Sequence, residues 1–207
     1  MLILFYLFHQ TLDASHCKFM DSKMRPIRLT WKVSTEFATE YMIIYKNGDD
    51  LRQDSLVLQI MHIMDTIWQR KDLDLKTYRL HPYDVLACSK TEGYIQVVKN
   101  AETIANISRT SKILNWLKEF NTEKEMEIVV KNFTRSLAAY CVATFILGIG
   151  DRHNDNIMLT KNGHFFHIDF GHILGNFKRI MRGMVSREWT KFILVQEFLD
   201  VVESEDE

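Results

Sequence analysis

The chain alternates between short apolar runs and longer amphipathic stretches, and the short runs are concentrated in its first half. "HCKFM" (16–20), "IRLTWKV" (27–33), "YMIIYK" (41–46) and "YIQVVK" (94–99) are rich in β-branched and aromatic residues and bounded by polar turns. This pattern is typical of β-strands. The opening "MLILFYLFHQ" is too short to span a bilayer and lacks the basic start of a signal peptide, so we expect a core strand there, or the ragged edge of a larger domain.

The longer stretches have helical spacing. Between residues 51 and 70 apolar positions recur every three or four residues, and the predicted buried face comprises Leu56, Ile60, Ile63, Met64 and Ile67. A second helix is predicted over about 124–147, with a buried stripe of Met126, Val129, Val130, Phe133, Leu137 and Tyr140. "ETIANI" (102–107) and "ILNWLKEF" (113–120) predict shorter helices. Strands followed by helices indicate an α+β fold with a small strand-rich lobe and a larger helical lobe.

A polar loop, "GIGDRHNDN" (148–156), follows the second long helix. After it, "NIMLT", the turn "KNG" and "HFFHID" predict a β-hairpin. The antiparallel return of the hairpin brings Asn156, at its start, close to Asp169, at its end. A carboxamide and a carboxylate are hard oxygen ligands, so the pair is a candidate Mg²⁺ site whose remaining positions water and phosphate would fill.

Composition removes some classes of function. The formal net charge of −1 argues against a basic nucleic-acid-binding protein. Cys17, Cys88 and Cys141 are too few and too widely spaced for a disulfide framework or a zinc site, which favours a reducing compartment. Charge is uneven, because basic residues gather in the stretch 178–191 and the chain ends in "ESEDE".

Three segments carry a resemblance to a known family. Protein kinases hold their metal ions with a catalytic-loop Asn and the Asp of a D-F-G, and this chain has "DRHNDN" (151–156) and "DFG" (169–171). With "GDDLRQD" (48–54) and "FHIDFGHILGN" (166–176), these segments closely resemble the phosphoinositide 3-kinase catalytic domain, nearest to class I and its gamma branch. The resemblance runs from about residue 17 to 202 and implies the two-lobed kinase-like fold of the phosphoinositide 3-/4-kinase superfamily.

The resemblance also implies a domain plan. Residues 1–16 would be an apolar edge of the small lobe, and residues 17–207 the catalytic domain, with the small lobe at about 17–97 and the large lobe at about 98–207. Compared with the family, the first small-lobe elements and several C-terminal helices would be missing, so the fold is expected to be incomplete.

Site residues follow from the same resemblance. Lys46 would bind the ATP α-phosphate and count among the catalytic residues, and Asp151 or His153 would take the proton of the inositol hydroxyl. An imidazole has the better unperturbed pKa for a base near neutral pH, whereas an aspartate can orient the hydroxyl, so the choice stays open. Asn156 and Asp169 would hold Mg²⁺. The implied nucleotide-binding residues are Met20, Ser22, Ile44, Lys46, Asp54, Tyr83, Gln96, Val98, Met158 and Ile168.

Residues from Asp169 to about 195 would form the activation loop, where Lys or Arg can pair with a phosphorylated headgroup. The implied lipid-substrate residues are His172, Lys178, Arg179, Arg182 and Arg187. Two positions depart from the family pattern: Arg28 stands where a Trp usually walls the nucleotide pocket, and Met24 where a phosphate-loop lysine is common.

The expected function is ATP-dependent phosphorylation of the 3-hydroxyl of phosphatidylinositol lipids, with phosphatidylinositol 4,5-bisphosphate as the expected substrate and ATP and Mg²⁺ as cofactors. Expected partners are a phosphoinositide headgroup at a membrane surface and a regulatory or adaptor subunit, with no nucleic acid. The expected location is cytoplasmic, with peripheral recruitment to membranes. Two alternatives remain: an inactive fragment that binds a nucleotide or a partner, and a protein kinase of the same superfamily. A basic activation loop favours a lipid over a protein substrate.

Overall fold

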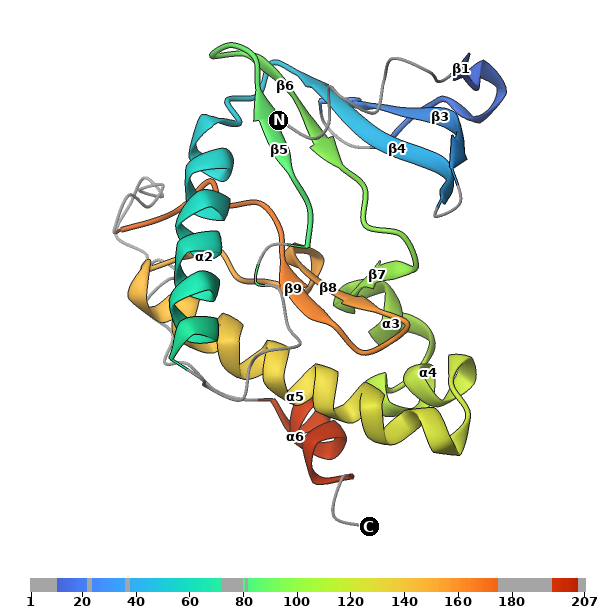
Figure 1. Cartoon of the computed structure of the whole chain (residues 1–207), viewed down its shortest axis with the longest axis vertical. Helices are drawn as coiled ribbons and strands as arrows, with labels where there is room; N and C mark the ends of the chain where they lie inside the picture. The colour runs from blue at the N-terminus through green and yellow to red at the C-terminus, as the bar shows by residue number, and fades with distance from the viewer. Residues whose placement is uncertain are drawn as a thin grey trace. The chain divides into compact units, whose positions relative to one another are not determined.

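The computed structural model describes residues 11–21, 24–35, 38–71, 80, 82–174 and 195–204 (Figure 1). The chain divides into two compact units, residues 1–59 with 81–98 and residues 60–80 with 99–207. The first unit is built on a sheet and the second is mainly helical, so the predicted α+β class is confirmed. The strand expected at 1–10 lies outside the described residues.

The first unit contains an antiparallel sheet. Two short strands, β1 (Thr11–Leu12) and β2 (Lys18–Phe19), pair with successive parts of β3 (Ile27–Thr35). The order continues with β4 (Ala38–Asn47), β6 (Glu92–Gln96) and β5 (Val85–Ala87). β3 covers the predicted strand at 27–33, and β4 covers the one at 41–46. β6 begins two residues before the predicted strand at 94–99 and ends three residues earlier than predicted.

The predicted strand at 16–20 is only partly correct. His16 ends a 3-10 turn, η2 (Ala14–His16), and β2 covers just Lys18 and Phe19. Asp13 explains the interruption, because its backbone N–H donates to the Thr30 carbonyl at 2.8 Å while its buried carboxylate accepts from Ser15 Oγ at 2.5 Å. These bonds favour a tight turn over a continuous strand.

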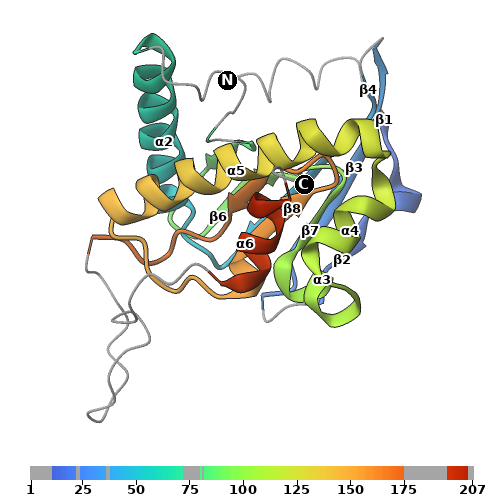
Figure 2. The same cartoon turned by 90° about the horizontal axis from the view of Figure 1, so that it is seen from below.

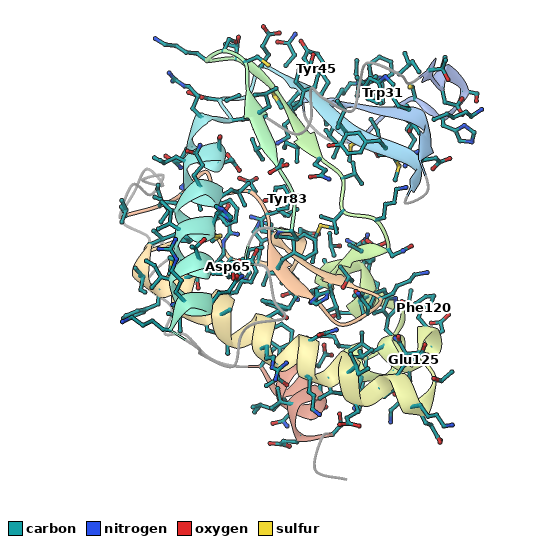
Figure 3. The ribbon with its side chains drawn as sticks, in the orientation of Figure 1. Trp31, Tyr45, Asp65, Tyr83, Phe120 and Glu125 are labelled. Atoms are coloured by element: carbon teal, nitrogen blue, oxygen red, sulfur yellow. The ribbon has the colours of Figure 1, made fainter. Side chains whose placement is uncertain are left out.

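Helix α2 (Arg52–Arg70) forms where expected, but the predicted buried face is wrong. Leu56, Ile63 and Ile67 are 51%, 57% and 50% exposed, whereas Val57 and Met61 are 0% exposed. Apolar residues lie on more than one side of this helix, so spacing alone did not identify the packed side. The packed side also includes the buried carboxylate of Asp65, labelled in Figure 3, which a hydrophobic stripe would not reveal.

The second unit begins with β7 (Ala101–Thr103), α3 (Ile104–Thr110) and α4 (Ile113–Phe120). The long helix α5 (Glu123–Ile146) follows, and it starts at Thr122, whose N–H donates to the Glu125 carboxylate at 2.8 Å. This is half of a capping box, and Figure 3 labels Glu125 at this corner beside Phe120. The predicted buried stripe of α5 is confirmed at Val129, Val130, Phe133, Leu137 and Tyr140, while Met126 is half-buried.

The predicted hairpin is confirmed as β8 (Ile157–Thr160) and β9 (Phe165–His167), preceded by the short turn η3 (Asn154–Asn156). β7 pairs with the free edge of β8. Gly163 allows the turn to lie directly on α5: its φ is +89°, and an added Cβ would come within 2.2 Å of the Val129 carbonyl oxygen. Ser136 on α5 also accepts from the Phe165 N–H at 2.9 Å.

α5 and α6 (Gln196–Glu203) lie next to each other in this unit (Figure 2). Together with the hairpin they enclose an aromatic core. Phe165 contacts Phe133, Tyr140 and Phe198 edge-on, with ring centroids 5.4 to 6.2 Å apart. The Tyr140 hydroxyl is satisfied, since it donates to the Leu80 carbonyl at 2.8 Å. The hairpin that carries the candidate site residues is therefore fixed on a rigid support. In the described parts of the chain, no helix is both long and apolar enough to cross a bilayer.

Candidate active site

The polar loop leaves the end of α5 through unusual backbone conformations. Gly148 has a φ of 51° and Asp151 a φ of 56°. The left-handed region costs little for Gly and is tolerated by Asp, so the sequence permits both turns. The Gly150 N–H donates to the His172 carbonyl at 3.0 Å, and the Leu174 N–H donates to the Leu147 carbonyl at 3.1 Å. The loop is thus fastened to the segment that follows Asp169.

Asn156 and Asp169 lie at the same end of the hairpin. The Ile168 N–H donates to the Asn156 carbonyl at 3.0 Å, which extends the pairing of β8 and β9 by one step. Asn156 is buried, and its amide nitrogen donates to the Asp151 carbonyl at 3.0 Å, which leaves its side-chain oxygen as the atom that can serve a cation. Asp169 has a φ of 59° and an exposed side chain.

The donor set fits Mg²⁺ better than a metal held by protein alone. Among the described residues no cluster of three or more His, Cys, Asp or Glu side chains could hold a metal. One carboxylate and one amide oxygen are what a Mg²⁺ ion shared with phosphate and water requires. The residues present therefore fit a nucleotide-bound Mg²⁺ ion.

Arg152 connects the two halves of this site, a role that sequence reasoning missed. Its guanidinium donates to the Gly150 carbonyl at 2.7 Å, to the Ile168 carbonyl at 2.8 Å and to the Asp169 carbonyl. The Arg152 guanidinium also lies 5.8 Å from the centre of the Phe170 ring. Three carbonyls around one cation form a rigid junction, so Arg152 positions the loop rather than contacting a phosphate. Its place next to Asp151 in a loop of charged residues was the available signal.

Asp151 and His153 lie together. His153 Nδ1 accepts from the Asp155 N–H at 3.2 Å, and His153 Nε2 is 4.0 Å from Asp151 Oδ2. A neutral imidazole that accepts at Nδ1 carries its hydrogen on Nε2. Both side chains are close to half exposed, at 44% and 45%, so a substrate hydroxyl can reach them.

The two histidines that flank D-F-G differ. His167 is buried and stacks on Tyr140, with centroids 5.0 Å apart and planes 11° apart. Burial, reinforced by the nearby Arg152 charge, lowers the pKa of His167 to about 3, so it is a neutral packing residue. His172 is half-buried and its carbonyl holds Gly150.

Met158 and Ile168 share a face of the hairpin. Met158 pairs with Phe166, and Ile168 lies two residues beyond Phe166, so the side chains of all three project to the same side. Both of these expected nucleotide-binding residues are half-buried, and Ile168 is bonded to the Asn156 carbonyl.

The remaining nucleotide candidates belong to the first unit. Lys46, near the end of β4, forms an ion pair with Asp49 at 2.8 Å and is 25% exposed. Ile44 lies two residues earlier, on the same face of the sheet. Met20 directly follows β2, and its N–H donates to the Pro26 carbonyl at 2.8 Å.

Four further candidates lie in α2 or close to β5 and β6. Asp54 is in the first turn of α2, and Tyr83 is buried near the start of β5. The Gln96 N–H donates to the Asp84 carbonyl at 2.9 Å, and its side-chain oxygen accepts from the Asp84 N–H at 3.1 Å. Gln96 can therefore offer an adenine its carbonyl but not its N–H. Val98 lies two residues beyond the end of β6.

Five candidates lie outside the described residues: Ser22, Lys178, Arg179, Arg182 and Arg187. Their roles stay predictions. Within the second unit, the structure brings together Asp151, His153, Asn156, Met158, Ile168, Asp169 and His172. Within the first, it places Met20, Ile44, Lys46, Asp54, Tyr83, Gln96 and Val98 on or beside one sheet. An Asp-Arg-His loop joined to a D-F-G segment matches the needs of phosphoryl transfer.

Comparison with known proteins agrees with this geometry. Residues 40–206 match the family model described as phosphatidylinositol 3- and 4-kinase. The chain is 44% identical to phosphatidylinositol 3-kinase 2 and 45% identical to phosphatidylinositol 3-kinase 3, both from Dictyostelium discoideum, with 92% of this chain covered in each case. The chain belongs to the phosphatidylinositol 3- and 4-kinase family. It spans 11% and 12% of the length of these two relatives.

Proposed function

We propose that this chain carries the catalytic centre of a phosphatidylinositol 3-kinase, which transfers the γ-phosphate of ATP to the 3-hydroxyl of a phosphatidylinositol lipid. The observation that carries the proposal is the backbone hydrogen bond from Ile168 to Asn156, which brings the two candidate metal ligands, Asn156 and Asp169, to one end of the hairpin. The names of the similar Dictyostelium proteins support the 3-kinase specificity.

Each half of the reaction has residues suited to it. Asn156 and Asp169 would hold Mg²⁺, which neutralises charge on the transferring phosphate when bound. Lys46 carries a positive charge on the sheet of the first unit and would stabilise the phosphates of ATP. Arg152 holds the Asp151 loop and the Asp169 backbone together, so that the charges are positioned before the substrate arrives.

The hydrogen bonds of His153 favour different roles for the two candidate bases, Asp151 and His153. Because Nδ1 accepts from Asp155, Nε2 carries the hydrogen and cannot accept another proton in that tautomer. Asp151 is then the group that receives the proton of the 3-hydroxyl, and His153 is a neutral donor close to it. If so, Asp151→Asn removes transfer at every pH, whereas His153→Gln, which can still donate, retains part of the rate.

The finer assignment to class I, near the gamma branch, rests on the motifs "DRHNDNIM" and "HIDFGHILGN". The basic residues Lys178, Arg179, Arg182 and Arg187 would bind the extra phosphates of phosphatidylinositol 4,5-bisphosphate, together with His172. The protein would be cytoplasmic, with recruitment to the membrane surface where its substrate resides. A regulatory or adaptor subunit would contact other parts of the whole protein.

The test is transfer of radiolabelled phosphate from ATP to defined lipids. We expect product on phosphatidylinositol 4,5-bisphosphate and none on a protein such as myelin basic protein. Neutralising Lys178, Arg179 and Arg182 together should reduce the rate on the bisphosphate at least about tenfold more than on phosphatidylinositol, because charge-assisted bonds are lost for each phosphate. Phosphorylated protein without phosphorylated lipid would instead identify a protein kinase. The absence of both products would support the inactive alternative.

A further inference from the structure

Arg28 lies on the face of the sheet that carries the candidate ATP-binding lysine. In the first unit, Arg28 on β3 pairs with Ile44 on β4 and with Lys18 on β2. Residues directly opposite each other in antiparallel strands project to the same side. Lys46 lies two residues beyond Ile44, so it shares this side and is the diagonal neighbour of Arg28, within reach of a long side chain.

Two of the lysines on this face already have acidic partners. Lys46 pairs with Asp49 at 2.8 Å. Lys32 lies four residues beyond Arg28 on β3, so it projects to the same side, and it pairs with the buried Asp13 at 3.0 Å. Lys18 is exposed at the edge of the sheet. Arg28 differs from Lys46 and Lys32, because no carboxylate among the described residues pairs with it.

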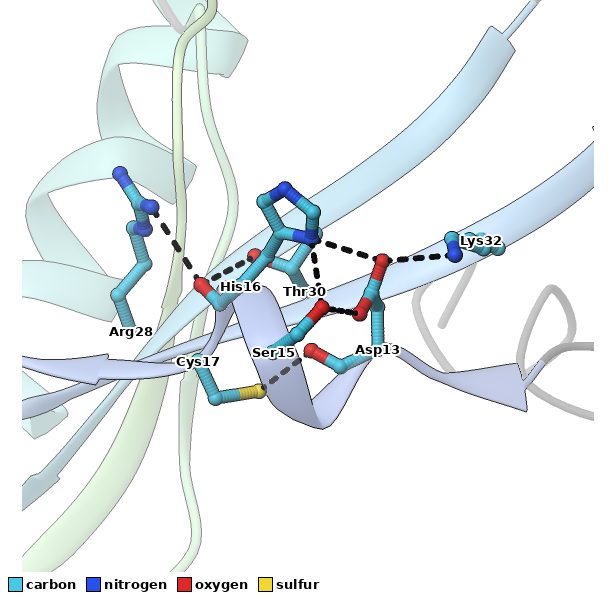
Figure 4. A network of polar contacts seen from close by, with 7 residues as sticks. All are labelled: Asp13, Ser15, His16, Cys17, Arg28, Thr30 and Lys32. Carbon is cyan, nitrogen blue, oxygen red and sulfur yellow. Dashed lines mark hydrogen bonds and ion pairs between the residues drawn. The ribbon is translucent and has the colours of Figure 1, made fainter.

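The contacts of the Arg28 guanidinium leave much of it unsatisfied. One terminal nitrogen donates to the His16 carbonyl at 3.4 Å, the long contact visible in Figure 4. The Nε atom is buried and has no hydrogen-bond partner within the described part of the chain. A buried donor without a partner costs free energy, and in native structures such a group calls for an explanation such as a missing ligand.

The surroundings point to a phosphate as that ligand. The loop 20–26, closed by the bond from Met20 to Pro26, ends two residues before Arg28. The side-chain end of Met24 lies against Gly48, where an added Cβ would be 2.4 Å away, so Met24 reaches the turn that follows Lys46. Arg28 and Lys46 therefore stand on the sheet beside the same loop, and a guanidinium offers several donors to a phosphate.

We propose that Arg28 contacts the nucleotide, with its guanidinium donating to the polyphosphate of ATP from the sheet face that presents Lys46. This inference rests on the proposed ATP-dependent function and adds a residue to it. Arg28 then strengthens the binding of ATP and ADP relative to adenosine, because only the first two carry the anionic chain.

The experiment is equilibrium dialysis of the full chain with ATP, ADP and adenosine, in the absence of lipid. Arg28→Gln should weaken ATP binding about tenfold or more, since a charge-assisted bond is lost, and should leave adenosine binding unchanged. The ATP affinity of Arg28→Lys should lie between those of the original chain and Arg28→Gln, because Lys keeps the charge but has no Nε donor. The matched control is Lys90→Gln, which removes an exposed charge from the turn between β5 and β6 of the same unit.

The outcomes separate this inference from the proposed function. If Arg28→Gln leaves ATP binding unchanged, or weakens ATP and adenosine equally, Arg28 is a support of the sheet and the inference is wrong, even if lipid is phosphorylated. Thermal unfolding by circular dichroism checks that each variant is folded, and if Arg28→Gln is not, the comparison of Arg28→Lys with the original chain decides. A selective loss of ATP binding supports the inference even where no lipid product forms. A chain that binds no ATP overturns both proposals.

Discussion

The guanidinium of Arg152 donates to the carbonyl of Ile168 at 2.8 Å, so the residue after Asp151 fixes the residue before Asp169. Its other bonds, to the carbonyls of Gly150 and Asp169, close the junction. Two segments that are separated by the whole hairpin are thereby held in one arrangement. The geometry of the candidate site therefore depends on a side chain that need not touch the substrate.

We expect Arg152→Lys to fold and to lose activity. A lysine keeps the positive charge but can satisfy only part of the three carbonyls that the planar guanidinium joins. The value of kcat should fall about tenfold or more because the loop is less well positioned, while the KM for ATP changes little. Lipid phosphorylation measured over a range of ATP concentrations separates the two constants. Arg109→Lys, on the exposed side of α3, is the control and should change neither.

Asp169→Asn should abolish transfer and spare the fold. The variant keeps the size of the side chain and removes the charge that a Mg²⁺ ion needs. Titration of activity with Mg²⁺ should show no recovery at high concentration, and the thermal unfolding midpoint should stay within a few degrees. Glu119→Gln alters an exposed carboxylate on α4 of the same unit and should remain active. Near-normal turnover of Asp169→Asn would remove this residue from the proposed metal site.

The candidate site was predictable from the sequence where local geometry determines it. A hairpin with a short turn fixes which residues return to its open end, so Asn156 and Asp169 could be paired from spacing alone. Arg152 could not be assigned in this way, because its three partners are backbone carbonyls that only the folded chain brings together.

In the fold, too, local spacing predicted some features and contacts between distant residues decided others. The stripe of α5 was predictable because its apolar residues occupy one side, while α2 carries apolar residues on several sides and tertiary packing selects one of them. The turn η2 was missed because Asp13 acts through Thr30, which is distant in sequence. The spacing of apolar residues along a segment identifies it as a helix or a strand. Which face of that element is buried depends on residues elsewhere in the chain.

The packed side of α2 predicts unequal effects of two similar substitutions. Met61 is 0% exposed and Ile63 is 57% exposed. Met61→Ala should lower the free energy of unfolding by about 2–5 kcal/mol, because it removes buried side-chain atoms and leaves a cavity. Ile63→Ala should change it by less than about 0.5 kcal/mol. Urea denaturation followed by fluorescence measures both changes. A larger loss of stability for Ile63→Ala than for Met61→Ala would mean that the face predicted from spacing is the buried one.

Asp13 predicts a dependence of stability on pH. Its buried carboxylate accepts from Ser15 Oγ at 2.5 Å, from Lys32 Nζ at 3.0 Å and from His16 Nδ1 at 2.9 Å, as Figure 4 shows. The hydrogen bond from Ser15, followed by that from Lys32, holds the pKa of Asp13 well below its ordinary 3.8. The folded chain therefore keeps this carboxylate ionised at a pH where the unfolded chain takes up a proton.

The sign of the effect follows from that difference. The stabilisation by Asp13 is present in full above its unfolded pKa of 3.8 and is lost as the pH falls through the lower folded value. Asp13→Asn should be less stable than the original chain at neutral pH, and the gap should narrow below a pH of about 4. Glu119→Gln, an exposed change on α4, is the control. Urea unfolding between neutral and acid pH tests this, and a gap that stays constant into acid would mean that the Asp13 carboxylate is not linked to the folding of this turn.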